Sequence, residues 1–309
     1  MEHSKNFYKD KKILVTGGAG FIGSHLVEKL VALEAKVTIL DNFSTGKLAH
    51  LHKVLPYITV LFSDIRAPFS CYKATMNQDI VFHLASFVSV PESIKNPTLC
   101  NTINIEGTKN ILEACRKNNI KTVIYASSSA VYGDRNDICK EDDIPSPKSP
   151  YASSKLQAEE LCKKYAREYC MNIACLRYFN VYGERQNPQG SYAAVVAKFS
   201  DYLLNQKPLT IFGDGLQTRD FIPVDQVVHA NINIALLNGL QGEVFNVGSG
   251  QSMNLFELIK KLELELKTKP TEITFLPARQ GDVLHSKASC EKYAKITSHL
   301  QSHLSERIR

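Results

Sequence analysis

The amino-acid sequence predicts an α/β protein, a Rossmann-type doubly wound parallel sheet with a smaller C-terminal lobe. Through about the first 180 residues, short apolar runs alternate with helical patterns, which is typical of parallel strands joined by crossover helices. A glycine-rich turn, G-G-A-G-F-I-G at residues 17–23, follows the first apolar run and begins a helical pattern. This order of strand, turn and helix is the one in which such sheets bind a dinucleotide.

Six strands are expected in this part of the chain, and right-handed crossovers between them would give a doubly wound sheet. They are Ile13–Val15, Val37–Leu40, Ile58–Phe62, Asp79–Leu84, Thr122–Ala126 and Ile173–Arg177. Between the first two strands, one apolar stripe recurs at helical spacing and is expected to pack on the sheet. Its members are Ile22, Leu26, Leu30 and Leu33.

The pattern changes after residue 180, where Gly183, Pro188 and Gly190 indicate a loop. Beyond this loop we expect two helices, Tyr192–Leu204 and Leu255–Leu266, and two strands, Leu209–Phe212 and Glu243–Val247. We therefore expect a dinucleotide-binding domain over residues 1–180, with a returning strand near 243–248. Residues 181–309 are expected to form mainly a substrate-binding lobe that is partly interleaved with it.

Composition excludes several classes of protein. With 309 residues, 44% of them hydrophobic and 22% charged, the chain can bury a core, which excludes a disordered or collagen-like protein. No stretch of about 18 apolar residues occurs, and the N-terminal residues are polar, so neither a membrane span nor a secretory signal is expected. We expect a cytoplasmic protein with no membrane partner.

Charge and cysteine usage narrow the partners further. The 37 Lys and Arg against 31 Asp and Glu give a net charge of +6, but the basic residues are scattered, so nucleic acid is not an expected partner. A mild positive balance suits a small anionic substrate. The eight cysteines include no C-x-x-C, so neither a zinc site nor a dithiol redox site is predicted, and no metal is expected.

The glycine turn and a later acid together predict an NAD site. Gly17, Gly20 and Gly23 allow a tight turn and a close approach of backbone N–H groups to a pyrophosphate at a helix N-terminus. Asp41 ends the second strand, where a carboxylate can accept hydrogen bonds from an adenosine ribose. Because this acid would repel a 2'-phosphate, NAD is favoured over NADP. The alternative is a glycine-rich turn with a capping aspartate.

Two further segments follow strands of the predicted sheet. Asp64-Ile65 comes after the third strand, and Leu84-Ala85-Ser86 comes after the fourth. Ligands of open sheets bind at the carboxyl ends of the strands, so both segments are candidates to line the dinucleotide. Each could equally be strand-end turn chemistry.

Three residues predict a catalytic group. Tyr151 and Lys155 form a Y-x-x-x-K pair on one face of a predicted helix, and an adjacent cation would lower the pKa of the phenol for work as a base. Ser127-Ser128-Ser129 closes the fifth strand, where a hydroxyl can hydrogen-bond both a substrate oxygen and the tyrosine. The alternatives are an ordinary amphipathic helix and a serine-rich turn.

The motifs taken together resemble a known family. They are T-G-G-A-G-F-I-G, D-N-F-S-T-G (41–46), S-S-S and V-Y-G (127–133), S-P-Y-A-S-S-K (149–155), L-R-Y-F-N-V-Y-G (176–183) and G-D-G-x-x-T-R-D-F (213–221). They look like the extended short-chain dehydrogenase/reductase family, and more narrowly like its NAD-dependent nucleotide-sugar epimerases and dehydratases. The resemblance runs from about residue 12 to residue 288.

The resemblance implies roles for individual residues. Tyr151 would be the base, Lys155 its partner and Ser128 the active hydroxyl, with Ser129 as the alternative. The dinucleotide would also be lined by Phe21, Ile22, Asp41, Asn42, Phe43, Ser44, Thr45, Gly46, Asp64, Ile65, Leu84, Ala85, Ser86, Asn104 and Phe179.

The same resemblance implies a UDP-sugar substrate. Asn180, Arg219, Arg279 and Asp282 match the family's diphosphate and ribose contacts, and arginine suits phosphate oxygens. Ser89 and Ser129 would face the sugar, and Ser286 matches the position that limits pocket size, where a small residue resembles enzymes that admit an N-acetyl group. The segment G-S-Y-A-A-V, which contributes Ala194 and Val195, resembles bacterial UDP-N-acetylglucosamine 4-epimerases.

These features predict a 4-epimerase that interconverts UDP-GlcNAc and UDP-GalNAc, with UDP-Glc and UDP-Gal as a further pair. Dehydratases and decarboxylases of this kind carry an acid where this chain has Ser129-Ala130, which disfavours them. A UDP-uronate substrate stays open, because Arg185 could contact its carboxylate. A non-catalytic NAD sensor or scaffold is disfavoured because Ser128, Tyr151 and Lys155 are all present.

Two expectations concern the assembly and the C-terminus. By resemblance, a homodimer would form through a four-helix bundle made by segments 104–117 and 151–168 of each subunit. Relatives continue through a G-W/Y-x-P element and a final helix, whereas this chain ends in the polar stretch Ser298–Arg309 with no such element, so altered packing is expected there. Ser289 also replaces an aspartate common in relatives.

Overall fold

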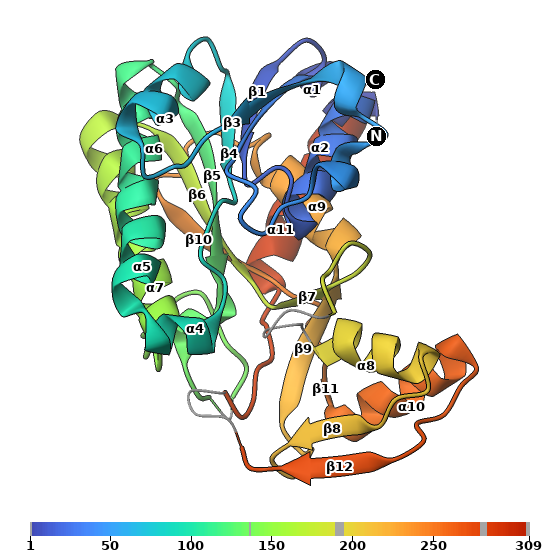
Figure 1. Ribbon diagram of the computed structural model, residues 1–309. Helices are drawn as coiled ribbons and strands as arrows, with labels where there is room; N and C mark the ends of the chain where they lie inside the picture. Colours follow the sequence, from blue (N-terminus) through green and yellow to red (C-terminus); the bar gives the residue numbers. More distant parts are fainter. Residues whose placement is uncertain (1, 136, 189–194, 279–282, 307–309) are drawn as a thin grey trace.

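A seven-stranded, wholly parallel sheet forms the centre of the molecule and confirms the predicted fold class (Figure 1). The computed structural model describes residues 2–135, 137–188, 195–278 and 283–306. The strand order is β10-β6-β5-β4-β1-β2-β3. The strands are β1 (Lys12–Thr16), β2 (Lys36–Asp41), β3 (Ile58–Phe62), β4 (Ile80–His83), β5 (Thr122–Ser128), β6 (Asn172–Tyr178) and β10 (Glu243–Val247).

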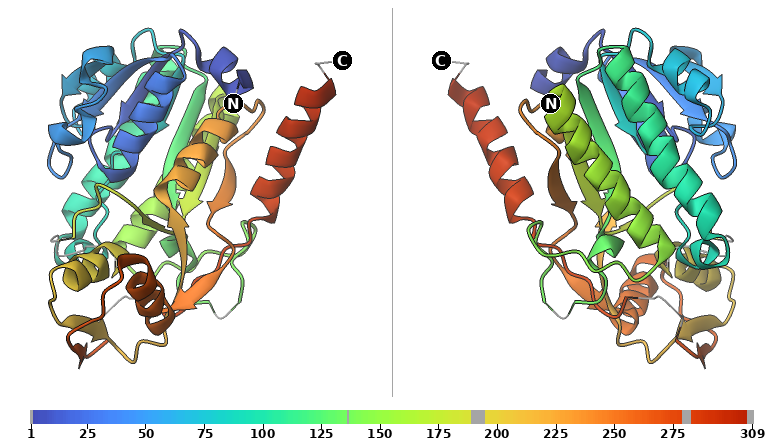
Figure 2. Two further views of the ribbon diagram at one scale, coloured as in Figure 1. Left: turned by 90° about the vertical axis from the view of Figure 1, so that its right-hand side faces the viewer. Right: turned by 90° about the vertical axis from the view of Figure 1, so that its left-hand side faces the viewer.

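Helices cover both faces of this sheet because its strands are apolar on both sides. On one face, α2 (Phe21–Ala32) and α9 (Val224–Ile234) pack together and share a core with β1 and β2. On the other face, α3 (Pro68–Thr75), α6 (Gly107–Lys117) and α7 (Pro150–Tyr169) enclose a second core (Figure 2). The predicted stripe of α2 is largely buried: Leu26 and Leu30 are fully enclosed, and Leu33 nearly so.

The predicted strands agree with the observed ones to within one or two residues at each end. All six strands expected before residue 180 are present. Further along, β8 (Leu209–Phe212), β10 and α10 (Leu255–Leu266) have the predicted bounds. β10 pairs parallel to β6, so a late segment of the chain completes the central sheet. Of the helix expected over 192–204, the described part is α8 (Val195–Leu204).

A smaller lobe lies beyond the carboxyl ends of the central strands (Figure 1). It contains a three-stranded sheet of β7 (Asn180–Tyr182), β9 (Thr218–Pro223) and β11 (Ser252–Asn254). A two-stranded sheet pairs β8 with β12 (Ile273–Leu276). Helices α8 and α10 pack against each other and share a small core with these strands.

The remaining elements are short and connect the larger ones. They are α1 (Glu2–Tyr8), α4 (Val90–Lys95), α5 (Pro97–Asn101), a π-helical turn η3 (Thr102–Glu106) and the 3-10 turns η1 (Leu48–Leu51), η2 (Leu55–Tyr57) and η4 (Ser129–Tyr132). None of the helices in the described ranges is both long and apolar enough to cross a lipid bilayer.

A final helix is present in the C-terminal part of the chain. Helix α11 (Glu291–Glu306) begins before the polar stretch and runs through most of it (Figure 2). Tyr293 and Ile296, three residues apart on one face, pack against the core. Lys292 Nζ donates to the carbonyl oxygen of Val244 at 2.9 Å, which ties α11 to β10. Among the described side chains of α11, Tyr293 and Ile296 are therefore the apolar contacts with the core.

Candidate active site

The glycine-rich turn between β1 and α2 is built for close backbone approach. Gly17 adopts a positive φ of 69° and its N–H donates to the carbonyl oxygen of Leu40 at 2.8 Å. A Cβ on Gly17 would meet the backbone nitrogen of Ala85, and a Cβ on Gly23 would collide with the carbonyl oxygen of Gly17. Any larger side chain at these two positions would therefore separate β1, α2 and the loop after β4.

The first turn of α2 offers its backbone donors to a ligand. Gly20 is the N-cap residue and has no side chain to accept a hydrogen bond from the N–H groups of that turn. These groups and the helix dipole attract an anion at this point. Since the turn lies at the carboxyl end of β1, the arrangement fits the pyrophosphate of NAD.

Asp41 organises the loop that follows β2. Its buried carboxylate accepts hydrogen bonds from the backbone N–H groups of Ala19 at 2.9 Å and Phe43 at 2.8 Å. Gly46 lies directly against the glycine turn: a Cβ atom added to it would be about 3.0 Å from Ala19. The predicted segment 41–46, including Ser44 and Thr45, therefore borders the glycine turn.

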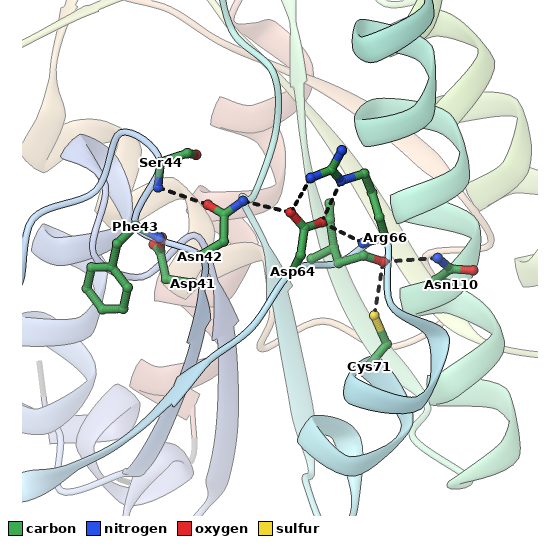
Figure 3. A network of polar contacts seen from close by, with 9 residues as sticks. Asp41, Asn42, Phe43, Ser44, Asp64, Arg66, Cys71 and Asn110 are labelled. Carbon is green, nitrogen blue, oxygen red and sulfur yellow. Dashed lines mark hydrogen bonds and ion pairs between the residues drawn. The ribbon is translucent and has the colours of Figure 1, made fainter.

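Asp64 lies at the end of β3 in a network with two neighbours (Figure 3). Its carboxylate accepts from Arg66 Nε at 3.0 Å, from Arg66 Nη2 at 2.8 Å and from Asn42 Nδ2 at 2.8 Å. The hydrogen bonds from Arg66 are the main reason that the pKa of Asp64 falls to about 2. The adjacent Ile65 packs against Gly107 at the start of α6. The sequence analysis did not identify Arg66.

Asn104 connects the loop after β4 to α7, the helix that carries Tyr151 and Lys155. Its Oδ1 accepts from Ser86 Oγ at 2.9 Å and from the N–H of Phe87 at 2.7 Å, and its Nδ2 donates to Ser154 Oγ at 2.9 Å. The side chain is 1% exposed. In this structure Asn104 therefore fixes the loop that holds Leu84, Ala85 and Ser86.

The structure brings the three predicted catalytic residues to one place. Ser149 caps α7 by accepting from the N–H of Ala152, so Tyr151 lies in the first turn of the helix and Lys155 one turn later. Lys155 Nζ donates to the carbonyl oxygen of Ala126 at 2.8 Å and lies 6.0 Å from the ring centroid of Tyr151. Ser128 ends β5 and accepts from the N–H of Ala130.

Burial dominates the electrostatics of this group. It lowers the pKa of Lys155 to about 8 and raises the pKa of Tyr151, which a hydrogen bond with Ser128 partly offsets. In the protein alone, the pKa of Tyr151 is therefore raised by burial, whereas the sequence analysis expected it to be lowered. Burial, and then the charge of Lys155, lower the pKa of His83 to about 3, so its ring is neutral.

One cavity of about 380 Å³ contains most of the predicted substrate residues. It opens between the carboxyl end of the central sheet and the smaller lobe, with β5, η4 and α7 on one side and α8 and β9 on the other. Its lining includes the predicted residues Ser128, Ser129, Tyr151, Phe179, Asn180, Val195, Arg219 and Ser286.

Two polar side chains, Asn180 and Asp220, link β7, β9 and the segment after residue 283 in the far wall. Asn180 Nδ2 donates to the carbonyl oxygen of Asp220 at 3.2 Å and to Ser286 Oγ at 3.4 Å. The fully buried carboxylate of Asp220 accepts from the backbone N–H groups of Ser249, Gly250 and Ala288 at 2.7 to 3.0 Å. Asp220 was not predicted, although it stands beside Arg219 in the G-D-G-x-x-T-R-D-F motif.

Some predicted residues lie elsewhere. Ser89 caps α4 by accepting from the N–H of Glu92 at 3.1 Å and is absent from the described lining of the cavity. Arg185 donates to Ser24 Oγ at 3.1 Å and to Glu28 at 2.6 Å, so its guanidinium is held on α2. Ala194, Arg279 and Asp282 lie outside the described residues.

The sequence analysis missed several polar residues of the lining: Lys148, Lys198, Thr210 and Gln217. Within the described part of the lining, every charged side chain is a cation, namely Lys148, Lys198 and Arg219. Such a cavity favours an anionic ligand. Of the four, Lys148 stood directly before S-P-Y and Gln217 stood within G-D-G-x-x-T-R-D-F, so these two carried a signal in the sequence, whereas Lys198 and Thr210 lay outside every motif.

Comparison with known proteins identifies what this arrangement is similar to. The model of the NAD dependent epimerase/dehydratase family matches residues 13–248. The UDP-N-acetylglucosamine 4-epimerase from Methanobrevibacter ruminantium, solved with UDP-N-acetylmuramic acid, is 40% identical, has a TM-score of 0.88 and overlaps 93% of this chain and 92% of its own.

Two UDP-glucose 4-epimerases are also similar. The enzyme from Thermotoga maritima, solved with UDP-glucose, is 36% identical with a TM-score of 0.87 and overlaps 92% of this chain and 91% of its own. The enzyme of Mycolicibacterium smegmatis is 36% identical over 89% of both proteins.

Proposed function

This chain belongs to the NAD-dependent epimerase/dehydratase family, and from that premise we propose that it is a UDP-sugar 4-epimerase whose main substrates are UDP-GlcNAc and UDP-GalNAc. The observation that carries the proposal is the cavity in which Tyr151 and Ser128 face a wall of cations and the small residue Ser286. UDP-Glc and UDP-Gal are the second substrate pair, in line with the two UDP-glucose 4-epimerases among the relatives.

The residues proposed for the cofactor surround the carboxyl ends of β1 to β4. The uncapped first turn of α2 would hold the pyrophosphate, and the carboxylate of Asp41 would accept hydrogen bonds from the adenosine ribose. Asp64 and the loop after β4 border the same path. When bound, NAD supplies a hydride acceptor for C4 of the sugar and returns the hydride afterwards.

The protein's own groups move the proton. Tyr151 takes the proton of the 4-hydroxyl as C4 loses its hydride, which leaves a 4-keto sugar, and it returns the proton after the hydride is delivered to the opposite face. Ser128 hydrogen-bonds the reacting oxygen. Because burial raises the pKa of Tyr151, its base form requires positive charge nearby, and Lys155 provides it from the next turn of α7.

Inverting the face requires the sugar to turn while its nucleotide stays in place. Arg219 and Lys198 on the far wall are the proposed anchors of the diphosphate, with Asn180 beside them. Ser286 leaves space at the sugar end, where its Oγ accepts a hydrogen bond from Asn180 Nδ2 at 3.4 Å. This space supports an N-acetylated sugar, and the 40% identical enzyme is itself named a UDP-N-acetylglucosamine 4-epimerase.

The other enzyme reactions have less support. No carboxylate follows Ser128 in η4, where Ser129 and Ala130 stand, so an acid for dehydration or decarboxylation is missing there. The alternative of a UDP-uronate substrate depended on a contact between Arg185 and the sugar carboxylate. The guanidinium of Arg185 is instead bonded to Glu28 on α2, so this alternative has less support.

We also propose a homodimer in which α6 and α7 of two subunits form a four-helix bundle. The two helices lie side by side on the outside of the sheet (Figure 2). Leu161 of α7 and Ile103 of η3, the turn that leads into α6, are only partly buried. Light scattering of the purified protein measures its mass directly.

The function is tested by incubating purified protein with UDP-GlcNAc and, separately, UDP-Glc, without added NAD, and recording proton NMR spectra of the nucleotide sugars. We expect the C4 epimer of each, formed faster from UDP-GlcNAc. Absence of both epimers even after NAD is added would reject the proposal, and faster turnover of UDP-Glc would reject the preference.

A further inference from the structure

A fully buried ion pair lies directly beneath the proposed active site and has no part in the reaction described above. Glu159 of α7 and Arg177 of β6 are 2.8 Å apart, and their side chains are 0% and 2% exposed. Removing two charges from water costs several kcal/mol for each ion, and a well-packed apolar pair is often at least as stable. Stability alone is therefore a weak reason for this pair.

The ion pair includes a third residue at the end of β5. Ser127 and Arg177 are register partners on neighbouring strands. Ser127 Oγ donates to Glu159 Oε1 at 2.5 Å, while Arg177 Nε and Nη2 donate to the two carboxylate oxygens at 2.9 and 2.8 Å. Both strand residues therefore point to α7 and converge on one carboxylate.

The next pair of register partners on β5 and β6 lines the cavity. Ser128 and Tyr178 follow Ser127 and Arg177, and because side chains alternate along a strand they project to the opposite side, where both line the cavity. Ser127, which is bonded to α7, therefore fixes the strand end on which Ser128 lies.

A second hydrogen bond joins β5 and α7, one helical turn before Glu159. Lys155 Nζ donates to the carbonyl oxygen of Ala126 at 2.8 Å, and Glu159 follows Lys155 by one helical turn. The catalytic helix is therefore joined to β5 at two successive residues, Ala126 and Ser127, immediately before Ser128.

We propose that Glu159, held between Ser127 and Arg177, is a positioning residue of the active site: it fixes the separation between the helix that carries Tyr151 and Lys155 and the strand end that carries Ser128. It also places a negative charge one turn from the Lys155 ammonium. This inference rests on the proposed epimerase reaction.

The guanidinium of Arg177 is itself prevented from swinging. Its central carbon lies 4.6 Å from the ring centroid of Tyr132, and the Tyr132 hydroxyl donates to Asn246 Oδ1 at 2.6 Å on β10. The planar fork and its stacking on an aromatic ring are properties that lysine lacks.

The sharpest test is Ser127→Ala, which removes the hydroxyl without changing any charge. We expect kcat to fall about tenfold at an unchanged KM, because the strand end loses its bond to the catalytic helix while the cavity wall stays intact. The matched control is Thr75→Val, which removes another buried hydroxyl, bonded to the carbonyl oxygen of Cys71 at 2.9 Å in α3. The control should lower the melting temperature with kcat unchanged.

A second variant, Glu159→Gln, removes the charge and nearly keeps the shape. Several groups face Lys155: His83 of β4, Tyr125 of β5, Cys100 of α5, and Tyr151, Glu159 and Cys162 of α7. Of these, Glu159 is the carboxylate, so its neutralisation should let Lys155 lose its proton at lower pH. The alkaline limb of kcat should move to lower pH in Glu159→Gln and stay in place in Ser127→Ala.

The outcomes separate this inference from the function on which it rests. Wild-type protein that epimerises no UDP-sugar contradicts the proposed function. An active wild type whose Ser127→Ala variant keeps full kcat contradicts the positioning role, and so does a folded Glu159→Gln variant with an unchanged pH profile. If Glu159→Gln does not fold, the comparison of Ser127→Ala with Thr75→Val still decides.

Discussion

The two sides of the cavity are built differently. The catalytic side stands on long, buried elements, the seven-residue β5 and the twenty-residue α7, whose polar side chains are fixed by buried bonds such as that from Lys155 to Ala126. The substrate side stands on β7 and β9, three and six residues long, in a lobe that exposes Leu264 and Phe275 by more than half. The residues proposed for the chemistry therefore stand on long, buried elements, while those proposed for selectivity stand on short ones.

The largest effect should come from the catalytic side, through Tyr151→Phe. We expect kcat to fall about a thousandfold, because the proton acceptor is lost while the ring and its packing remain. Bound NAD and the melting temperature should be unchanged, which absorbance and thermal unfolding of the purified variant will show. Near-normal turnover would contradict the assigned base.

The next effect should come from the substrate side, through Ser286→Tyr. Filling the space beside Asn180 should lower the ratio of kcat/KM for UDP-GlcNAc to that for UDP-Glc by about a hundredfold, since discrimination by pocket size reaches this order. Ser286→Ala is the matched control, because it removes the hydroxyl without filling the pocket. Equal losses on both substrates would refute the role in selectivity.

A substitution behind the far wall of the cavity, Asp220→Asn, should act mainly on substrate binding. In Asp220→Asn, an amide NH₂ would face some of the backbone N–H groups of Ser249, Gly250 and Ala288, and the wall that carries Arg219 should loosen. We expect about a tenfold rise in KM with a smaller change in kcat. Asp214→Asn, on an exposed residue of the same region, is the control and should leave both constants unchanged. A fall in kcat alone would place Asp220 on the catalytic side of the comparison.

The smallest effect near neutral pH is a pH dependence that belongs to the catalytic side. The pKa of Lys155 is lowered to about 8 by burial, so its ammonium is present below this pH and is lost as the pH rises through it. We expect kcat to fall by about half near pH 8 and further above it. KM should change little over the same range. An unchanged kcat up to pH 10 would show that the lysine charge is not required.

The sequence predicted the catalytic side better than the substrate side, for physical reasons. Apolar runs such as Ile58–Phe62 identify buried strands directly, and the spacing of Tyr151 and Lys155 places both on one helical face. Glu159, one further turn along the same face, carried this signal too and was overlooked. The alternation that marks a strand is weak in β9, where Thr218, Arg219 and Asp220 come before any apolar residue.

The remaining misses arise from contacts between distant segments. Thr210, Lys198 and Lys148 meet in one lining although they lie up to about 60 residues apart, and no local pattern links them. The docking of α11 likewise depends on where Tyr293 and Ile296 meet the core. For the same reason a residue expected in the site can lie outside it: Arg185 is held by Glu28, which belongs to a helix far earlier in the chain.

The pairing of β10 with β6 has a consequence for biosynthesis. Residues 243–247 complete a sheet whose other six strands end at residue 178, so the ribosome must add about 65 further residues before the edge of β6 is covered. At roughly 5–20 residues per second, that edge waits for several seconds with its backbone N–H and C=O groups unpaired. Nascent chains that stop in this interval should therefore be prone to aggregation and dependent on chaperones.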